Sequence, residues 1–372
     1  PYYVDAGHFY LESNNIKNGQ INRDTEVFIN DEFYNKQTDK LLHTGDIVMV
    51  QSGHVGHTAV IPQELDGTAA HALIMFTDYK EKTDSFFLNY QFQTYKSKIK
   101  LDKITTGNTI KHILSSEMKE FFIDHPSYEE QQKIGSFFKQ LDDTIALHQR
   151  KLDLLKEQKK GYLQKMFPKN GAKVPELRFA GFADDWEERK LSNYITITGG
   201  NAWKSSDYSI GGDYLVVTIA NVQGQRNIND KIGNKISVAD PGKYLLKRED
   251  ILVSLTGNVG RVSRMTDIPA VLNQRVGLVK PKTKKIDDEF LFQVLSNRRF
   301  ESSMVASGQG AAQANISNND VLSYELLVPQ DVREQSIIAH FFRNFDNAIA
   351  LHQHKLELLK EKKKGFLQKM FV

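Results

Sequence analysis

The chain has 372 residues, a formal net charge of +3 and no cysteine. The lack of cysteine excludes disulfides, thiolate metal sites and a cysteine nucleophile, and no apolar run approaches the ~20 residues that a membrane-spanning helix needs. The length predicts two or three domains. The absence of cysteine fits the cytosol, and we expect a cytoplasmic protein.

Residues 1–128 alternate short apolar runs with turn signals, which predicts a small α+β domain on a mainly antiparallel, curved sheet. A strand is expected at 47–50 and a helix at 85–95. Two loops, 51–57 and 105–112, are rich in small, amide and cationic residues. They fit contact with DNA, since such side chains bond base edges and glycine permits close approach; the alternative is that they are ordinary hairpin turns. The candidate DNA contacts in this half are His54, Thr105, Asn108, Thr109, Lys111 and His112.

Residues 129–168 predict one long helix, because they are rich in Leu, Lys, Gln and Glu and proline occurs only at the end. The apolar residues recur at steps of 3, 4 and 7, as in the a/d seam of a coiled coil. His148 and Lys159 are polar residues within that seam. The residues expected to face a partner helix are Phe138, Leu141, Ile145, His148, Leu152 and Leu155.

After a linker at 169–186, residues 187–330 predict a second α+β domain of the same type, with strands at 214–217 and 276–279 and a helix at 289–300. Its candidate DNA contacts are amide and arginine side chains in loops, because amides can bond adenine and arginine can bond guanine through two hydrogen bonds. They are Arg261, Gln274, Arg275, Gln309, Gln313 and Asn315.

The chain repeats itself at an offset of 204 residues. Segment 333–372 is identical to 129–168 at 25 of 40 positions, and the turn at 257–260 repeats the turn at 53–56. Residues 331–372 therefore predict a second long helix, and the shared turn is interpreted as scaffold. The matching seam residues are Phe342, Phe345, Ile349, His352, Leu356 and Leu359.

We expect the two helices to pair with each other in antiparallel orientation, which would relate the two halves by a pseudo-two-fold axis. The alternative is that each helix packs on its own domain. Each tail is basic, with six Lys/Arg against two acidic residues in 150–168 and six Lys against two acidic residues in 354–372. This charge indicates a solvated face, contact with DNA phosphates or docking of an acidic partner. The lead-in at 174–191 has no counterpart in the first copy, so we expect roughly 30 residues of that copy to lie upstream.

Motifs for catalysis are missing from the sequence. It has no GxxxxGK[ST] phosphate loop and no glycine-rich dinucleotide turn, and the pair His54 and His57 lacks the neighbouring carboxylate of a metal site. We therefore expect no enzyme activity in this chain and no metal. The alternatives are a nuclease with a cryptic site and a non-catalytic DNA-binding or interaction protein of another kind, such as a phage-tail protein.

Four motifs resemble those of a known family. They are PELRFAGF at 175–182, leading into WEERKLSNY at 186–194, then VPQDVREQSIIAHFF at 328–342 and KLELLKEKKKGFLQKMF at 355–371. With the order domain, helix, domain, helix, the whole chain resembles the DNA-specificity (S) subunits of type I restriction–modification enzymes. The missing first lead-in departs from that pattern.

The resemblance implies that each recognition domain reads one half of a split, asymmetric target in double-stranded DNA, and that the helix pair spaces the halves. It also implies partners: two methyltransferase subunits, which carry S-adenosylmethionine, and restriction subunits that act as motor and nuclease with ATP and Mg²⁺. In this reading those cofactors belong to the partner subunits and none to this chain.

Overall fold

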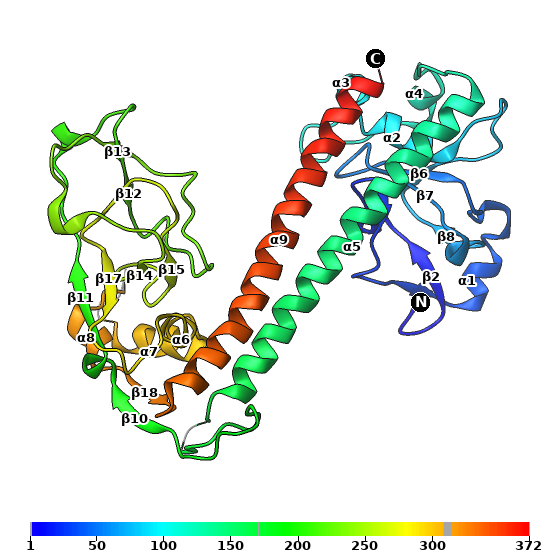
Figure 1. Cartoon of the computed structure of the whole chain (residues 1–372). Coiled ribbons are helices and arrows are strands. Elements are labelled where there is room, and N and C mark those ends of the chain that lie inside the picture. The colour runs from blue at the N-terminus through cyan, green and yellow to red at the C-terminus, as the bar shows by residue number, and fades with distance from the viewer. Residues whose placement is uncertain (1, 170, 309–313, 372) are drawn as a thin grey trace. The chain divides into compact units, whose positions relative to one another are not determined.

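The computed structural model describes residues 2–169, 171–308 and 314–371. These residues group into two compact units (Figure 1): Pro1–Lys151 with His352–Val372 make unit 1, and Leu152–Leu351 make unit 2. Each unit therefore holds one globular domain together with half of each long helix. Within the described residues, no helix is long and apolar enough to cross a membrane.

The domain of unit 1 contains a four-stranded sheet in the order β1-β5-β2-β8, a three-stranded sheet in the order β7-β6-β9, and the hairpin β3–β4. The strands are β1 (Tyr3–Val4), β2 (His8–Leu11), β3 (Ile16–Lys17), β4 (Gln20–Ile21), β5 (Phe28–Ile29), β6 (Ile47–Val50), β7 (Thr58–Val60), β8 (Ala69–Ala70) and β9 (Leu73–Phe76). The helices are α1 (Asp31–Asn35), α2 (Ser85–Phe92), α3 (Tyr95–Ile104) and α4 (Ser115–Lys119).

The domain of unit 2 contains sheets in the orders β11-β17-β14-β15, β13-β12-β16 and β10-β18. The strands are β10 (Glu187–Lys190), β11 (Ile195–Gly199), β12 (Tyr214–Val217), β13 (Lys235–Ile236), β14 (Ile251–Ser254), β15 (Val262–Arg264), β16 (Ala270–Leu272), β17 (Val276–Pro281) and β18 (Glu325–Val328). The helices are α6 (Asp288–Leu295), α7 (Arg298–Ser307) and α8 (Asn318–Ser323). In both units the strand pairings are antiparallel, except β2–β8 and β12–β16. This is the predicted α+β class with mainly antiparallel sheets.

Each single helix expected inside a domain is two helices in the structure. The side chain of Thr94 accepts a hydrogen bond from the backbone of Ser97 and starts α3 directly after α2. Asn297 does the same for α7, after α6. An N-cap satisfies backbone N–H groups that the helix leaves unpaired, so it begins a new helix at that residue. The apolar pattern alone does not predict the break between the two helices.

The two long helices are α5 (Tyr128–Met166) and α9 (Val332–Met370), each about 58 Å long at 1.5 Å per residue. In each unit the two helices lie side by side and run in opposite directions (Figure 1). In unit 1, Phe137 packs on Phe366 with ring centroids 5.2 Å apart. In unit 2, Tyr162 packs on Phe341 at 5.1 Å. The helices therefore pair in antiparallel orientation, as predicted. Because of this pairing, each unit contains part of α5 and part of α9.

Candidate nucleic-acid interface and helix seam

In unit 1 the two predicted DNA-contact loops lie against each other. The backbone N–H of Gly53 donates to the carbonyl of Lys111 over 3.0 Å, and Ser52 forms a β-bridge with His112. The chain therefore closes the loop that follows α3 onto the turn that follows β6. Of the predicted contacts, the exposed ones are His54, Asn108, Thr109, Lys111 and His112. Thr105 is half-buried and donates its hydroxyl to Leu101, so it supports the loop.

Cationic groups surround this pair of loops. Burial is the main cause that lowers the pKa of His57 below its usual value, and His54, Lys98 and Lys17 lower the pKa further. The exposed lysines Lys98 and Lys17 provide positive charge beside these loops. Lysine side chains beside exposed polar loops suit contact with DNA phosphates, and loop side chains suit base edges.

In unit 2 three loops come together at the matching place. The backbone N–H of Gly257 donates to Ala314, and Thr256 forms a β-bridge with Asn315. The backbone N–H of Leu255 donates to the carbonyl of Arg275 over 3.0 Å. Gln274, Arg275 and Asn315 are exposed on these loops. The predicted readers Gln309 and Gln313 lie outside the described residues.

Two polar partners hold the side chain of Arg261 in place. Its guanidinium lies 3.3 Å from the Glu301 carboxylate and donates to the Gln223 side chain over 3.2 Å. The nearby turn takes the same form in both units, because Gly56 donates to Val50 and Gly260 donates to Ser254, each over 3.0 Å. The contacts with Glu301 and Gln223 hold the Arg261 side chain within its own domain, so it is less available to a ligand than Arg275.

Sequence reasoning missed His71. The Gln51 N–H donates to the carbonyl of Ala72, as that of Leu255 does to Arg275 in unit 2, so the exposed His71 occupies the place of Gln274. The offset between the two copies is 203 residues at this point. The offset of 204 found from the sequence places Ala70 opposite Gln274, so only the paired hydrogen bonds of the two units identify His71.

None of the predicted seam residues is exposed. Buried are Phe138, Leu152, Leu155, Phe342 and Leu356; half-buried are Leu141, Ile145, His148, Phe345, Ile349, His352 and Leu359.

The seam lysines pair with buried acids that the heptad pattern did not single out. Lys159 lies 2.6 Å from Asp346 in unit 2, and Lys363 lies 2.7 Å from Asp142 in unit 1. The two pairs are 204 residues apart and are thus the same contact made twice. Burial and the Asp142 carboxylate raise the pKa of Tyr90, whose hydroxyl donates to that carboxylate over 2.8 Å. A buried ion pair needs such extra hydrogen bonds to offset its desolvation.

His148 and His352 meet in unit 1, with their Nδ1 atoms 2.8 Å apart. Burial, followed by His148 and the lysines Lys355 and Lys151, lowers the pKa of His352. One ring donates and the other accepts, which requires at least one neutral imidazole. The predicted seam histidines therefore bond each other across the helix pair.

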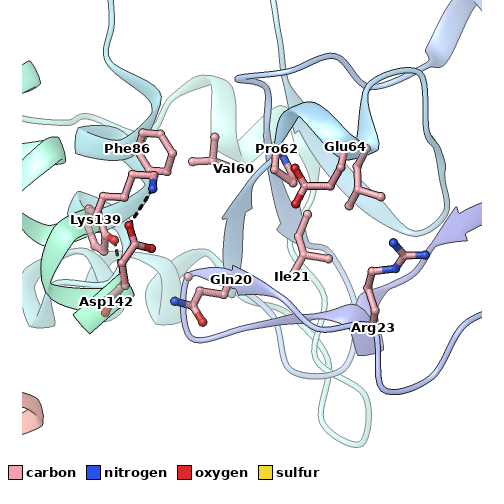
Figure 2. A pocket seen from close by; sticks show the side chains of 13 residues that line it. Gln20, Ile21, Arg23, Val60, Pro62, Glu64, Phe86, Lys139 and Asp142 are labelled. Atoms are coloured by element: carbon pink, nitrogen blue, oxygen red, sulfur yellow. Dashed lines mark hydrogen bonds and ion pairs between the residues drawn. The ribbon is translucent and has the colours of Figure 1, made fainter. Parts of the chain in front are cut away.

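A cavity of about 320 Å³ lies in unit 1 between hairpin β3–β4, β7, α2 and α5. Figure 2 shows Lys139 and Asp142 on one side and Arg23 and Glu64 on the other. Its lining contains no Ser, Cys or His and carries the charged side chains Arg23, Glu64, Lys139, Asp142 and Asp143. Among the described residues, no three His, Cys, Asp or Glu side chains are grouped so that they could hold a metal ion.

Comparison with known proteins decides the family. Residues 6–157 and 183–361 match the model of the type I restriction modification DNA specificity domain. The chain belongs to this family. The predicted resemblance is confirmed, and each of the two matched stretches covers most of one domain and most of the long helix that follows it.

Relatives in Methanocaldococcus jannaschii agree with this assignment. The chain is 24% identical over 339 residues to the type I restriction enzyme MjaVIII specificity subunit, covering 88% of this chain and 78% of that protein. It is also 24% identical over 302 residues to the putative MjaX specificity subunit, covering 79% and 69%.

Solved structures show the same fold. The S subunit of a type I restriction–modification system from M. genitalium has a TM-score of 0.68 at 15% identity, covering 100% of this chain and 94% of that one. A chain from a type I system solved to explain complex assembly and conformational transition has a TM-score of 0.51 at 15% identity, with the same coverage.

Proposed function

We propose that this specificity-family chain is the DNA-reading subunit of a type I restriction–modification enzyme. Each of its two domains reads one half of a bipartite, asymmetric DNA target. The observation that carries the proposal is the repeated scaffold with different side chains in equivalent loops: His71 and His112 in unit 1 stand where Gln274 and Asn315 stand in unit 2. Two copies of one scaffold with different readers suit two different half-sites.

The exposed loop residues supply the reading chemistry. Gln274 and Asn315 carry amides that match the donor and acceptor pattern of adenine, and Arg275 matches guanine. Lys111 and Lys98 supply charge for phosphates, which positions a domain on DNA without selecting sequence. Two lysine-rich helix tails add phosphate contact or a surface for subunit docking.

The helix pair serves as the spacer between the half-sites. The Lys–Asp contact present in both units, together with the apolar seam, fixes the register of α5 against α9. Half-sites read from one face of DNA are separated by about 34 Å for each helical turn, and a continuous helix of about 58 Å is long enough to span that distance.

Catalysis belongs to the partners in this proposal. Two methyltransferase subunits dock on the helices and domains and bring S-adenosylmethionine, and restriction subunits bring ATP and Mg²⁺. The chain itself then acts as a non-catalytic subunit in the cytoplasm, where the cell's DNA lies.

The test is co-expression of the chain with its methyltransferase subunits in a host without DNA methylation, followed by methylome sequencing. We expect adenine methylation at one bipartite motif, and no methylation from the chain alone. Replacing 187–330 by the domain of another family member should change one half of the motif. If both halves change, the domains do not read separately. Sequence-specific DNA binding without methyl transfer in any subunit combination would favour a DNA-binding role outside restriction–modification.

A further inference from the structure

Unit 2 contains a buried cluster of charges beside its helix pair. The guanidinium of Arg226 donates to both oxygens of Glu289, over 2.6 and 2.8 Å, and lies 3.5 Å from the Asp346 carboxylate on α9. The guanidinium of Arg264, whose side chain is 1% exposed, lies 3.3 Å from Glu289 and 2.8 Å from Asp288. Two guanidinium groups therefore fill the space between β15, α6 and α9.

In unit 1 two of these charged positions are apolar. Val60 occupies the last register position of β7, as Arg264 does in β15. Phe86 is the second residue of α2, as Glu289 is the second residue of α6, and an aspartate caps both helices. Val60 and Phe86 both line the cavity of unit 1 (Figure 2). The cavity thus lies where unit 2 holds its charge cluster.

The loop that carries Arg226 is one residue shorter in unit 1. In each unit an asparagine side chain closes this loop by donating to the carbonyl of a second asparagine, eight positions later for Asn221 and seven for Asn15. The shorter loop contains hairpin β3–β4, which has no arginine and presents Gln20 to the cavity. The space is therefore a cavity of about 320 Å³, and pockets for small ligands start at about 300 Å³.

The carboxylate that Arg226 approaches in unit 2 is present in unit 1 as well. Asp142 is the counterpart of Asp346 at the offset of 204 residues, and it lines the cavity. A seam lysine and a side chain of the short helix bind this carboxylate in both units: Gln293 donates over 2.9 Å in unit 2, and Tyr90 over 2.8 Å in unit 1. The acid keeps its position in unit 1, whereas the guanidinium beside it is missing.

Two more carboxylates line the cavity in unit 1. Asp143 stands where unit 2 has Asn347. Glu64 lies across the cavity from α5 (Figure 2) and has no ion-pair partner among the described residues. The lining also carries the cations Arg23 and Lys139, but each of them already donates to a carboxylate of unit 1. Three carboxylates against two engaged cations favour a cationic ligand.

We infer that this cavity is a binding site for a guanidinium group from outside the chain. The group takes the space that Arg226 and Arg264 fill in unit 2, with Glu64 and the second carboxylate oxygen of Asp143 as acceptors. A guanidinium suits this site better than an ammonium, because its planar fork of N–H groups bonds two acceptors at once. Its source is either a small guanidinium compound or an arginine side chain of another subunit.

The first test is isothermal titration of the full chain with agmatine. Cadaverine, a dication of similar length without a guanidinium, is the matched ligand. We expect saturable binding of agmatine and binding of cadaverine that is at least about tenfold weaker. Glu64→Gln and Asp143→Asn should each weaken agmatine binding about tenfold, because each removes a charged acceptor. Glu129→Gln removes an exposed acid of α5 outside the cavity and should bind agmatine as the wild type does.

A second variant fills the cavity. Val60→Arg combined with Phe86→Glu places in unit 1 the ion pair that Arg264 and Glu289 form in unit 2. This double variant should lose agmatine binding while its circular dichroism stays that of the wild type. If the double variant does not fold, the two acid variants still decide the question, since they change only charge.

Co-expression with methyltransferase subunits separates the two sources, and this arm rests on the proposed function. A partner's arginine is the source if Glu64→Gln with Asp143→Asn weakens assembly in size-exclusion chromatography and agmatine competes with it. A small compound is the source if agmatine binds and assembly is unchanged. The inference is overturned if agmatine does not bind and assembly is unchanged, or if agmatine binds equally well to both acid variants. Methylation of a bipartite motif by the same complex tests the proposed function independently of the cavity.

Discussion

Glu334 and Glu130 occupy equivalent positions in the two copies of the repeat, 204 residues apart. The same substitution can therefore be tested in a buried and in an exposed environment. Glu334→Ala removes a carboxylate that accepts two hydrogen bonds from Arg178 and lies 3.4 Å from the indole nitrogen of Trp186. The Arg178 side chain is 12% exposed and therefore cannot regain full hydration without moving. Glu130→Ala removes an exposed carboxylate with no such partners among the described side chains.

The magnitudes follow from burial. Removing one partner of a buried ion pair costs about 3–5 kcal/mol, and the partial exposure of Arg178 places our expectation for Glu334→Ala at about 3 kcal/mol. Removing an exposed carboxylate costs less than about 0.5 kcal/mol. With a urea dependence of about 2–3 kcal/mol per molar, Glu334→Ala should lower the unfolding midpoint of unit 2 by about 1 M.

Tryptophan fluorescence is the assay, because both tryptophans, Trp186 and Trp203, lie in unit 2. Urea titrations of the wild type, Glu334→Ala and Glu130→Ala should show a large shift for the first variant and almost none for the second. Equal shifts for both variants, or a shift below about 0.2 M for Glu334→Ala, would refute the argument that the lead-in segment is anchored by a buried ion pair.

Three further predictions concern the seam and the loops. Because the pKa of His352 is lowered in the folded chain, the unfolded state binds more protons as the pH falls below about 6.5, and stability should decrease from pH 7.5 to 5.5. Urea titrations followed by circular dichroism measure this, and His352→Gln, which leaves His148 without an imidazole partner, should flatten the dependence. Gln274→Ala should cost about 1–3 kcal/mol of discrimination in one half-site only, whereas Lys98→Ala should weaken binding to all sequences and reduce the salt slope by about 1; binding titrations with variant sites at several salt concentrations separate the two. Matched four-residue insertions in α5 after Gln149 and at the equivalent position of α9 add about 6 Å and should lengthen the unspecified gap of the methylated motif by one to about two base pairs; an active complex with an unchanged gap would show that the helices do not set the spacing.

The sequence by itself determined the repeat, the two long helices, their seam and the class of the domains. These features follow from local periodicity, because an apolar residue at every third or fourth position buries one face of a helix whatever lies opposite. Strands such as β6 and β12 were predicted at their observed bounds, 47–50 and 214–217, because short apolar runs between turn signals have few alternative conformations. The break between α2 and α3 escaped prediction because it depends on one capping side chain, Thr94.

Only the tertiary structure decided which polar side chains meet. Lys159 was recognised as polar within the seam, but its partner Asp346 lies 187 positions away in the sequence. The gathering of Gln274 and Asn315 on neighbouring loops has the same origin. A charge or amide gains from a partner only at a specific distance and angle, and that geometry is set by which elements pack together. The burial of Glu334 likewise depends on Arg178, which lies 156 positions away in the sequence.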